Sequence, residues 1–466
     1  MADIYVRGGW IITMDKDRRV IKEGAVAIED GKIAAVGKRE ALDRDYRYHS
    51  DVIIDATRDV VMPGLVNTHV HLAQALLRAC ADYLPLIRWL KERVWPLQGN
   101  YRPNEALASA RLAALEMMLT GTTTFLETGL VGRYGPDNII EAVHGMGLRA
   151  AVARHVMDMS GYALEKGIIH EGLVESGEQS FNDTIRLYHK YHGRDNRIWI
   201  WFGPRTPGAV SVELYRKISE KARELGTGIT MHLAEVREDV EYTTKEFGKR
   251  PVEFAHWVGL TGRNVVLVHV VWADDDEISL LSRTGTTVSH NPSSNMKLGS
   301  GMARVSEMLR AGVNVALGTD GGPSNNDYDL LREMKHAALL QPARTLDPRS
   351  ISAEEVLEMA TINGARALGI DRLVGSVEPG KEADIIVVDY WQPHLRPLSN
   401  PISHVVYSAT GRDVKHVIVG GRLLVFNGRP LTVDYDEVLE EAERAAWELY
   451  SRAGICTRPD TRWPIE

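Results

Sequence analysis

Residues 62–71 read Met-Pro-Gly-Leu-Val-Asn-Thr-His-Val-His, an apolar, strand-like run that ends in two histidines. Side chains two positions apart in a strand point to the same face, so His69 and His71 converge on one point. If this run is the first strand of a (β/α)₈ barrel, that point lies at the active-site mouth, where two neutral imidazoles can chelate a metal. Taken alone, the pair could equally be two half-buried structural histidines.

Seven further apolar segments follow, and amphipathic stretches such as 103–120, 212–225, 274–283 and 305–311 separate them. The segments are 122–128, 149–156, 198–204, 228–235, 265–271, 286–292 and 314–321. Strands that alternate with helices imply parallel βαβ units. Eight units favour a closed barrel over an open sheet, because no Gly-x-Gly-x-x-Gly turn follows the first strand.

The two ends of the chain instead contain short predicted strands joined by turns. Asp30-Gly31, between two apolar runs, is a hairpin signal. Similar strands return near the C-terminus, and neither set is long enough to form a sandwich alone. We therefore predict an α/β chain with a discontinuous β-sandwich. Its expected divisions are residues 1–62 (first part of the sandwich), 63–376 (barrel), 377–432 (second part of the sandwich) and 433–466 (C-terminal helix and tail). Two amphipathic helices, 353–368 and 436–453, are expected outside the barrel.

Composition excludes several classes of protein. The 466 residues carry a net charge of −8 without a basic run, which argues against nucleic-acid and membrane-surface partners. The two cysteines, Cys80 and Cys456, lie far apart in sequence and support neither a secreted disulfide framework nor a cysteine-based zinc site. No leader sequence or apolar run of ~20 residues is visible. The expected location is the cytoplasm.

Three more potential ligands stand at strand ends. His232 closes the fifth apolar segment, His269 the sixth and Asp320 the eighth, and Glu235 follows His232 by three positions. The carboxyl ends of barrel strands share one face, so these side chains should gather around His69. Each could be structural on its own, but the shared position is hard to reconcile with chance.

These residues, with Pro63-Gly64 and Gly318-Thr319-Asp320-Gly321, resemble the amidohydrolase superfamily. The chain is most similar to its branch of adenosine-type and S-adenosylhomocysteine deaminases, guanine deaminase-like enzymes and triazine (atrazine) chlorohydrolases. The likeness covers nearly the whole chain, including the motifs at 121–124, 289–295 and 380–384. The motifs are specific to the superfamily, not to one substrate.

The resemblance implies a site with one divalent metal, held by His69, His71, His232 and Asp320. Zn²⁺ suits three nitrogens and a carboxylate best, and Fe²⁺ is also compatible. Binuclear relatives use a modified lysine on the fourth strand, and that strand has no lysine here. Metal-activated water would attack a ring carbon, with Asp320 as ligand and base. His269 would hold the water by hydrogen bonding, and Glu235 would protonate the ring nitrogen and the departing amine.

Five weaker candidates stand where relatives contact substrate, and each could instead be packing or an ion pair: Trp89, Gln98, Arg154, Arg205 and Asn295. His290 is expected to organise its loop. Gln98 replaces a glutamate with which the nucleoside deaminases grip ribose hydroxyls, and this departure favours a free base or small heterocycle.

The resulting hypothesis is an aminohydrolase (deaminase) of a nitrogen heterocycle of the purine, pterin, pyrimidine or triazine type. One alternative is a hydrolase that removes chloride or another group from an s-triazine-like ring. Another is a nucleoside-type deaminase of S-adenosylhomocysteine or methylthioadenosine. Gly321 favours deamination, because atrazine chlorohydrolase has an asparagine there. A non-enzymatic scaffold conflicts with the complete residue set. The partner is a small heterocyclic substrate, and the relatives suggest a homo-oligomer, a dimer or larger.

Overall fold

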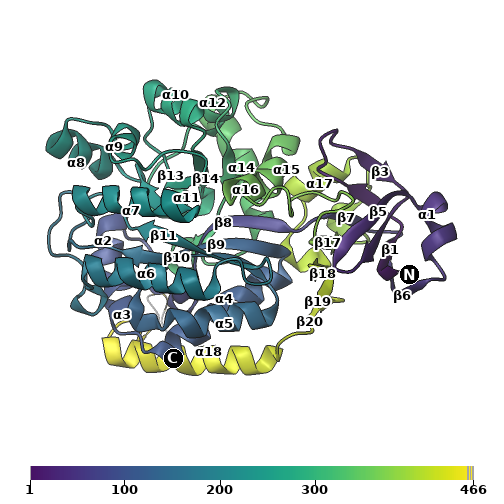
Figure 1. The fold of residues 1–466 in the computed structure, drawn as a ribbon, viewed down its shortest axis with the longest axis horizontal. Helices are drawn as coiled ribbons and strands as arrows, with labels where there is room; N and C mark the ends of the chain where they lie inside the picture. The colour runs from purple at the N-terminus through teal and green to yellow at the C-terminus, as the bar shows by residue number, and fades with distance from the viewer. Residues whose placement is uncertain (1, 459–460, 462, 464–466) are drawn as a thin grey trace.

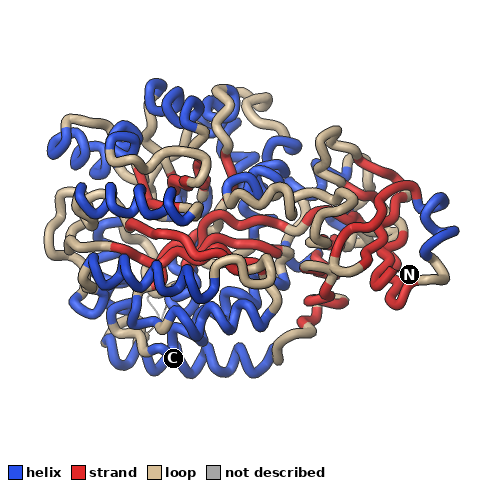
Figure 2. The backbone as a smooth tube through the Cα atoms, viewed as in Figure 1, coloured by secondary structure: helices blue, strands red, loops and turns tan. Residues whose placement is uncertain are grey.

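A closed parallel barrel forms the body of the protein in the computed structural model, which describes residues 2–458, 461 and 463 (Figures 1 and 2). Its strands run in the order β15-β14-β13-β12-β11-β10-β9-β8-β16. The ring closes because the last segment is split: β15 pairs with β14, and β16 pairs with β8. The predicted fold class is confirmed. The strands are β8 (Leu65–His71), β9 (Thr122–Leu130), β10 (Arg149–Val156), β11 (Ile198–Pro204), β12 (Ile229–Leu233), β13 (Val265–His269), β14 (Thr287–His290), β15 (Val315–Leu317) and β16 (Asp320–Gly321).

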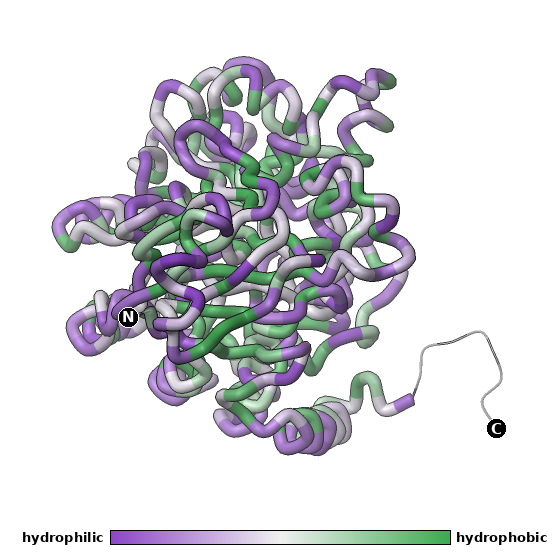
Figure 3. The backbone as a smooth tube through the Cα atoms, turned by 90° about the vertical axis from the view of Figure 1, so that its right-hand side faces the viewer, coloured by the Kyte–Doolittle hydropathy of each residue, from purple (hydrophilic) through white to green (hydrophobic). Residues whose placement is uncertain are grey.

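Helices surround this barrel, and hydrophobic residues concentrate along the strands at its centre (Figure 3). Local sequence sets the helix ends: the Ser211 hydroxyl accepts from the Leu214 amide at the start of α7, and Gly226 ends that helix at φ 65°. The helices of the barrel are α2 (Leu86–Trp89), α3 (Trp95–Gly99), α4 (Pro103–Leu119), α5 (Pro136–Met146), α6 (Gly177–Tyr191), α7 (Val212–Leu225), α8 (Arg237–Phe247), α9 (Pro251–Trp257), α10 (Asp275–Thr284), α11 (Pro292–Lys297), α12 (Val305–Arg310), α13 (Gly322–Asn325) and α14 (Leu330–Thr345).

The helix expected over 353–368 is divided into α15 (Ala353–Ala360) and α16 (Ile362–Ala367). Thr361 separates the two with φ −129° and ψ −96°, outside the helical region. In α16, Gly364 lies against β8, where an added Cβ would come within 2.7 Å of Val66. The break therefore lets α16 turn toward the strand that carries His69 and His71.

A second body packs two sheets from both ends of the chain. One has the order β5-β4-β1-β6 and the other β20-β19-β18-β17-β7-β2-β3. The N- and C-terminal parts join where β7 pairs antiparallel with β17, as the sequence predicted. The hairpin at Asp30-Gly31 connects β4 to β5, with both residues at positive φ. The elements are β1 (Ala2–Arg7), β2 (Trp10–Ile12), β3 (Val20–Lys22), β4 (Gly24–Glu29), β5 (Lys32–Lys38), α1 (Arg39–Tyr46), β6 (Ser50–Asp55), β7 (Val60–Pro63), β17 (Ile385–Val388), α17 (Pro401–Tyr407), β18 (Val414–Val419), β19 (Arg422–Phe426) and β20 (Arg429–Pro430).

The C-terminal helix α18 (Tyr435–Ala453) runs along the barrel beside α4 (Figure 1). Just beyond it, Cys456 forms a disulfide with Cys80, whose Cα lies 5.4 Å away. This single bond was not predicted from the sequence, and it forms because the fold returns the C-terminus to the segment after β8. Among the described residues, no helix has the length and apolar character needed to cross a membrane.

Candidate active site

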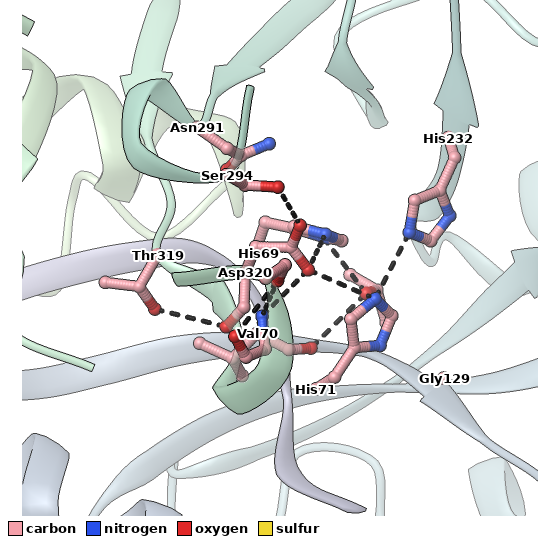
Figure 4. Close-up of polar contacts among 12 residues, drawn as sticks. His69, Val70, His71, Gly129, His232, Asn291, Ser294, Thr319 and Asp320 are labelled. Carbon is pink, nitrogen blue, oxygen red and sulfur yellow. Dashed lines mark hydrogen bonds and ion pairs between the residues drawn. The ribbon is translucent and has the colours of Figure 1, made fainter. Parts of the chain in front are cut away.

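The polar residues at the strand ends do meet at one mouth of the barrel (Figure 4). His69 and His71 come from β8, His232 from β12, His269 from β13 and Asp320 from β16. Their nitrogen and oxygen atoms form two overlapping groups, His69–His71–His232 and His69–His269–Asp320, within which the ligand atoms lie no more than 4.8 Å apart. The structure therefore brings together the residues that the sequence placed at the carboxyl ends of the barrel strands.

His71 and His232 face each other across 3.2 Å between their Nε2 atoms. The Nδ1–H of His232 donates to the Arg205 carbonyl at 3.1 Å, so its Nε2 holds a lone pair. Burial, followed by the charge of neighbouring histidines, holds the pKa of both rings well below the usual value, so both are neutral. Two such nitrogens at this distance are suited to share a cation.

His69 is held in the same ligand-ready tautomer. The Thr128 hydroxyl donates to the Val70 carbonyl at 3.3 Å, so it accepts from Nδ1–H of His69 at 3.0 Å. The Nε2 of His69 is buried, has no hydrogen-bond partner in the described part of the chain, and lies 3.3 Å from Asp320 Oδ1. That same oxygen lies 3.5 Å from His71 Nε2, and Ser294 donates to the other carboxylate oxygen at 2.6 Å.

His269 has the opposite tautomer. The side-chain amides of Asn291 and Asn295 donate to its Nδ1 at 3.2 and 3.0 Å, so the proton lies on Nε2. That Nε2–H lies 3.6 Å from a Glu235 oxygen. His269 is therefore arranged to donate a hydrogen bond rather than to bind a metal through Nε2.

Glu235 is buried beside the cluster. Burial raises the pKa of its carboxyl well above the usual value, and the negative charge of Asp320 raises it further. A raised pKa suits a carboxyl that has to hold a proton and deliver it to a bound molecule.

The backbone at the cluster is unusual. His269 has φ 73° and Asp320 has φ 65°, in the left-handed region that non-glycine residues rarely adopt. Such conformations cost on the order of 1–3 kcal/mol each and concentrate at functional sites, where the surrounding structure enforces them.

A small cavity of about 30 Å³ opens at the cluster. Trp89, expected to contact substrate, lines it together with Tyr162 and the apolar side chains of Leu86, Leu90 and Leu298. Apolar walls with a few convergent polar groups are typical of small-molecule sites. Tyr162 was missed, because the segment that carries it belongs to no strand end.

The other four candidates separate into two pairs. Arg205 lines this cavity and also a narrow space beside it, which Gln98 lines as well. Arg154 instead pairs with Glu175 and Asp183, and Asn295 contacts His269. Both are thus placed to support the site.

Several supporting residues were not predicted: Thr128, Asn291, Ser294 and His155. Thr128 is the last residue of the predicted segment 122–128 and lies near the end of β9, so its position could have marked it as a candidate. His290 is buried, and neither ring nitrogen has a partner among the residues described, so its expected role in organising the loop stays a prediction.

Comparison with known proteins identifies the family. A closed barrel with histidines and an aspartate at its mouth defines a class of metal-dependent hydrolases. Residues 60–424 match the Amidohydrolase family, and residues 24–47 match the imidazolonepropionase-like composite domain of bacteria. The chain belongs to the amidohydrolase family.

Two relatives match over almost their full lengths. The 5'-deoxyadenosine deaminase of Methanosarcina acetivorans is 41% identical over 97% of this chain and 100% of its own. The 5-methylthioadenosine/S-adenosylhomocysteine deaminase of Syntrophobacter fumaroxidans is 40% identical over 96% of this chain and 98% of its own.

Two zinc-containing solved structures are also similar. The adenosine deaminase of Xanthomonas campestris, with bound zinc, has a TM-score of 0.89 and 29% identity, covering 97% of this chain and 99% of its own. The atrazine chlorohydrolase TrzN of Arthrobacter aurescens TC1, complexed with zinc, has a TM-score of 0.87 and 26% identity, covering 95% and 100%. With the family match, these likenesses identify the chain as a metal-dependent hydrolase of carbon–nitrogen bonds in cyclic amidines, a deaminase of a nitrogen heterocycle.

Proposed function

We propose that this protein hydrolyses the exocyclic amino group of an adenine nucleoside modified at its 5' position, and releases ammonia. The observation that carries the proposal is the set of proton positions at the mouth of the barrel. Nε2 atoms and one carboxylate oxygen face a common point, and the buried carboxyl of Glu235, whose pKa is raised, lies beside them.

The residues fit a single zinc ion. His69, His71, His232 and Asp320 would supply three nitrogens and one oxygen, a donor set that zinc accepts. The orphaned Nε2 of His69 supports this assignment. When bound, zinc supplies Lewis-acid activation of a water molecule near neutral pH.

The chain's own groups then move the protons. Asp320 accepts a proton from the attacking water, and Glu235 donates its proton to the ring nitrogen next to the attacked carbon. The Nε2–H of His269 donates a hydrogen bond to the oxygen that adds to the ring. The carbon–nitrogen bond breaks as the amino group takes up the proton that Asp320 received and leaves as ammonia, while the added hydroxyl returns its proton to Glu235 and becomes a carbonyl oxygen.

A nucleoside is supported over the free base that Gln98 alone favoured. Both relatives at 40–41% identity are named for nucleosides or their 5'-thio derivatives. The residues that line the site extend from the metal-ligand cluster to Gln98, because Arg205 lines both the cavity at the cluster and the space lined by Gln98. Gln98 in that space can both donate to and accept from a hydroxyl.

The test is ammonia release by zinc-loaded protein from 5'-deoxyadenosine, 5'-methylthioadenosine and adenine. We expect kcat/KM for at least one nucleoside to exceed that for adenine by tenfold or more. A parallel assay with 6-chloropurine 5'-deoxyriboside measures chloride release. A preference for the chloro compound over 5'-deoxyadenosine by tenfold would contradict deamination as the principal reaction, and a preference for adenine would contradict the nucleoside.

A further inference from the structure

Asp320 has a backbone conformation that requires support from its neighbours. Its φ of 65° lies in the left-handed region, which is costly for an aspartate. The strand that carries it, β16, has two residues and pairs with β8 at two positions, Asp320↔Val70 and Gly321↔His71. A ladder of this length supplies little restraint. Groups outside β16 must therefore keep Asp320 in the conformation that directs its carboxylate to the cluster.

Two hydrogen bonds restrain Asp320 from outside the strand. One acts on the backbone: Asn325 Nδ2 donates at 2.9 Å to the carbonyl of Thr319. That carbonyl belongs to the planar peptide group that joins Thr319 to Asp320, so the bond fixes the plane that precedes Asp320. The other acts on the side chain: the Ser294 hydroxyl donates to Asp320 Oδ2 at 2.6 Å (Figure 4). Oδ1 is thus directed toward His69 Nε2, 3.3 Å away.

Both restraints are anchored on one buried carboxyl group, that of Glu333 in α14. Its Oε1 accepts at 2.7 Å from the same Asn325 nitrogen, which carries two hydrogens and so can also donate to Thr319. Its Oε2 accepts at 3.2 Å from the backbone N–H of Ser293, the residue before Ser294 in α11. Glu333 is completely buried and does not line the cavity at the cluster. Its carboxyl group therefore connects α14 to the two segments that hold Asp320.

We propose that Glu333 is a positioning residue for Asp320, and that it acts through Asn325 and α11. It keeps the backbone in the left-handed region and the carboxylate directed at the point that His69 and His71 face. The inference rests on the proposed function for the metal that Asp320 binds. A ligand that adopts its binding conformation for only a fraction of the time lowers the apparent metal affinity by that fraction.

An alternative role for Glu333 is structural, as a joint between α11, α13 and α14. The two roles predict different results. Loss of a joint lowers stability and leaves the geometry of the metal ligands unchanged. Loss of the positioning role changes metal affinity and ligand geometry in protein that is still folded.

Two substitutions in the full-length protein test the proposal. Asn325→Leu keeps the approximate size of the side chain and removes both donated hydrogen bonds. We expect the zinc Kd, measured by competition with a chelating dye, to rise roughly 10–100-fold. Glu333→Gln keeps the shape but leaves one acceptor oxygen for two donors, so a smaller rise of at least about threefold is expected. The visible absorption of the cobalt-substituted protein reports ligand geometry, and it should change in both variants.

Glu277→Gln and Asn314→Leu are the matched controls. Glu277 is also buried and accepts from a backbone N–H, that of Val252, at 2.7 Å. Asn314 Nδ2 also donates to two oxygens, Thr287 Oγ1 and the Asn363 carbonyl, each at 3.0 Å. Neither residue lines the cavity at the cluster. Both variants should be less stable in urea, with the zinc Kd and the cobalt spectrum of the wild type.

The double variant tests the route. Because Glu333 acts partly through Asn325, the zinc Kd of Asn325→Leu/Glu333→Gln should rise by less than the product of the two single factors. A Kd within twofold of the wild type in either single variant would overturn the proposal. An equal rise in the matched controls, or a double variant that equals the product, would overturn it as well.

Failure of the proposed function is distinguishable from failure of this inference. If zinc binding responds as expected and no nucleoside releases ammonia, the positioning role stands. If the wild type binds neither zinc nor cobalt, the metal assignment fails, and unfolding of the metal-free protein decides. Glycine adopts φ 65° without strain, so Asp320→Gly should stabilise the wild type more than it stabilises Asn325→Leu, where Asp320 can already relax. A difference of about fivefold in the unfolding equilibrium constant supports the restraint, and equal effects refute it.

Discussion

Thr128→Val should weaken metal binding without disturbing the barrel. Valine has nearly the shape of threonine, so the change removes the hydroxyl and little else. That hydroxyl accepts from Nδ1–H of His69 while donating to the Val70 carbonyl. Without it, the buried imidazole loses its only side-chain partner at Nδ1 and the preference for the tautomer with a free Nε2.

The size of the effect follows from this hydrogen bond. Leaving a buried donor unsatisfied costs about 1–3 kcal/mol. Loss of a partner that orients a metal-bound histidine typically weakens metal affinity by roughly 10–100-fold, or ~1.4–2.7 kcal/mol. The two free-energy ranges overlap, so we expect the zinc Kd to rise by roughly 10–100-fold.

The assay is competition for zinc with a chelating dye, together with circular dichroism to check the fold. Thr124→Val is the matched control, because Thr124 is buried on the same strand and its hydroxyl has no partner among the described residues. A Thr128→Val Kd within twofold of the wild-type value, or an equal increase in Thr124→Val, would refute the reasoning.

Three further predictions concern the proton donor, the sandwich and the C-terminus. Glu235→Gln should retain zinc and lose roughly 10²–10⁴-fold in kcat, since glutamine donates no acidic proton; the exposed Glu238→Gln should match the wild type in ammonia release. Burial lowers the pKa of His416 to about 4, so its contribution to the free energy of unfolding is present above pH 6.5 and is lost as the pH falls toward 4. Urea unfolding should show a loss of about 3 kcal/mol over this range that is absent from His416→Asn. A reducing agent should lower wild-type stability by on the order of 6 kcal/mol, because the Cys80–Cys456 bond spans 376 residues, and should have no effect on Cys80→Ser.

The sequence predicted what depends on strand periodicity. All eight barrel segments, and the meeting of His69, His71, His232, His269 and Asp320, follow from side-chain alternation and from the common direction of parallel strands. These rules use only local spacing. They place a residue at the mouth without describing its neighbours.

The parts that were missed depend on long-range packing. Arg154 lies near the end of β10, but whether it faces substrate or Glu175 depends on how the segment after β10 folds back. Cys80 and Cys456 meet only because α18 returns along α4. The proton positions on His69 and His269 are determined by Thr128, Asn291 and Asn295, partners from other strands and loops.

The pairing of β7 with β17 constrains how the chain can be made. Strands β1 to β7 are synthesised first; β7 can pair with β2 at once, but its other neighbour, β17, emerges more than 300 positions later. Through most of translation an apolar strand edge thus stays open, a condition that favours misassociation. The barrel can close meanwhile, because β8 to β16 precede β17. Synthesis of the C-terminal strands is therefore the step that completes the molecule, and a chain that stops short of β17 would carry a finished catalytic mouth on an unfinished sheet.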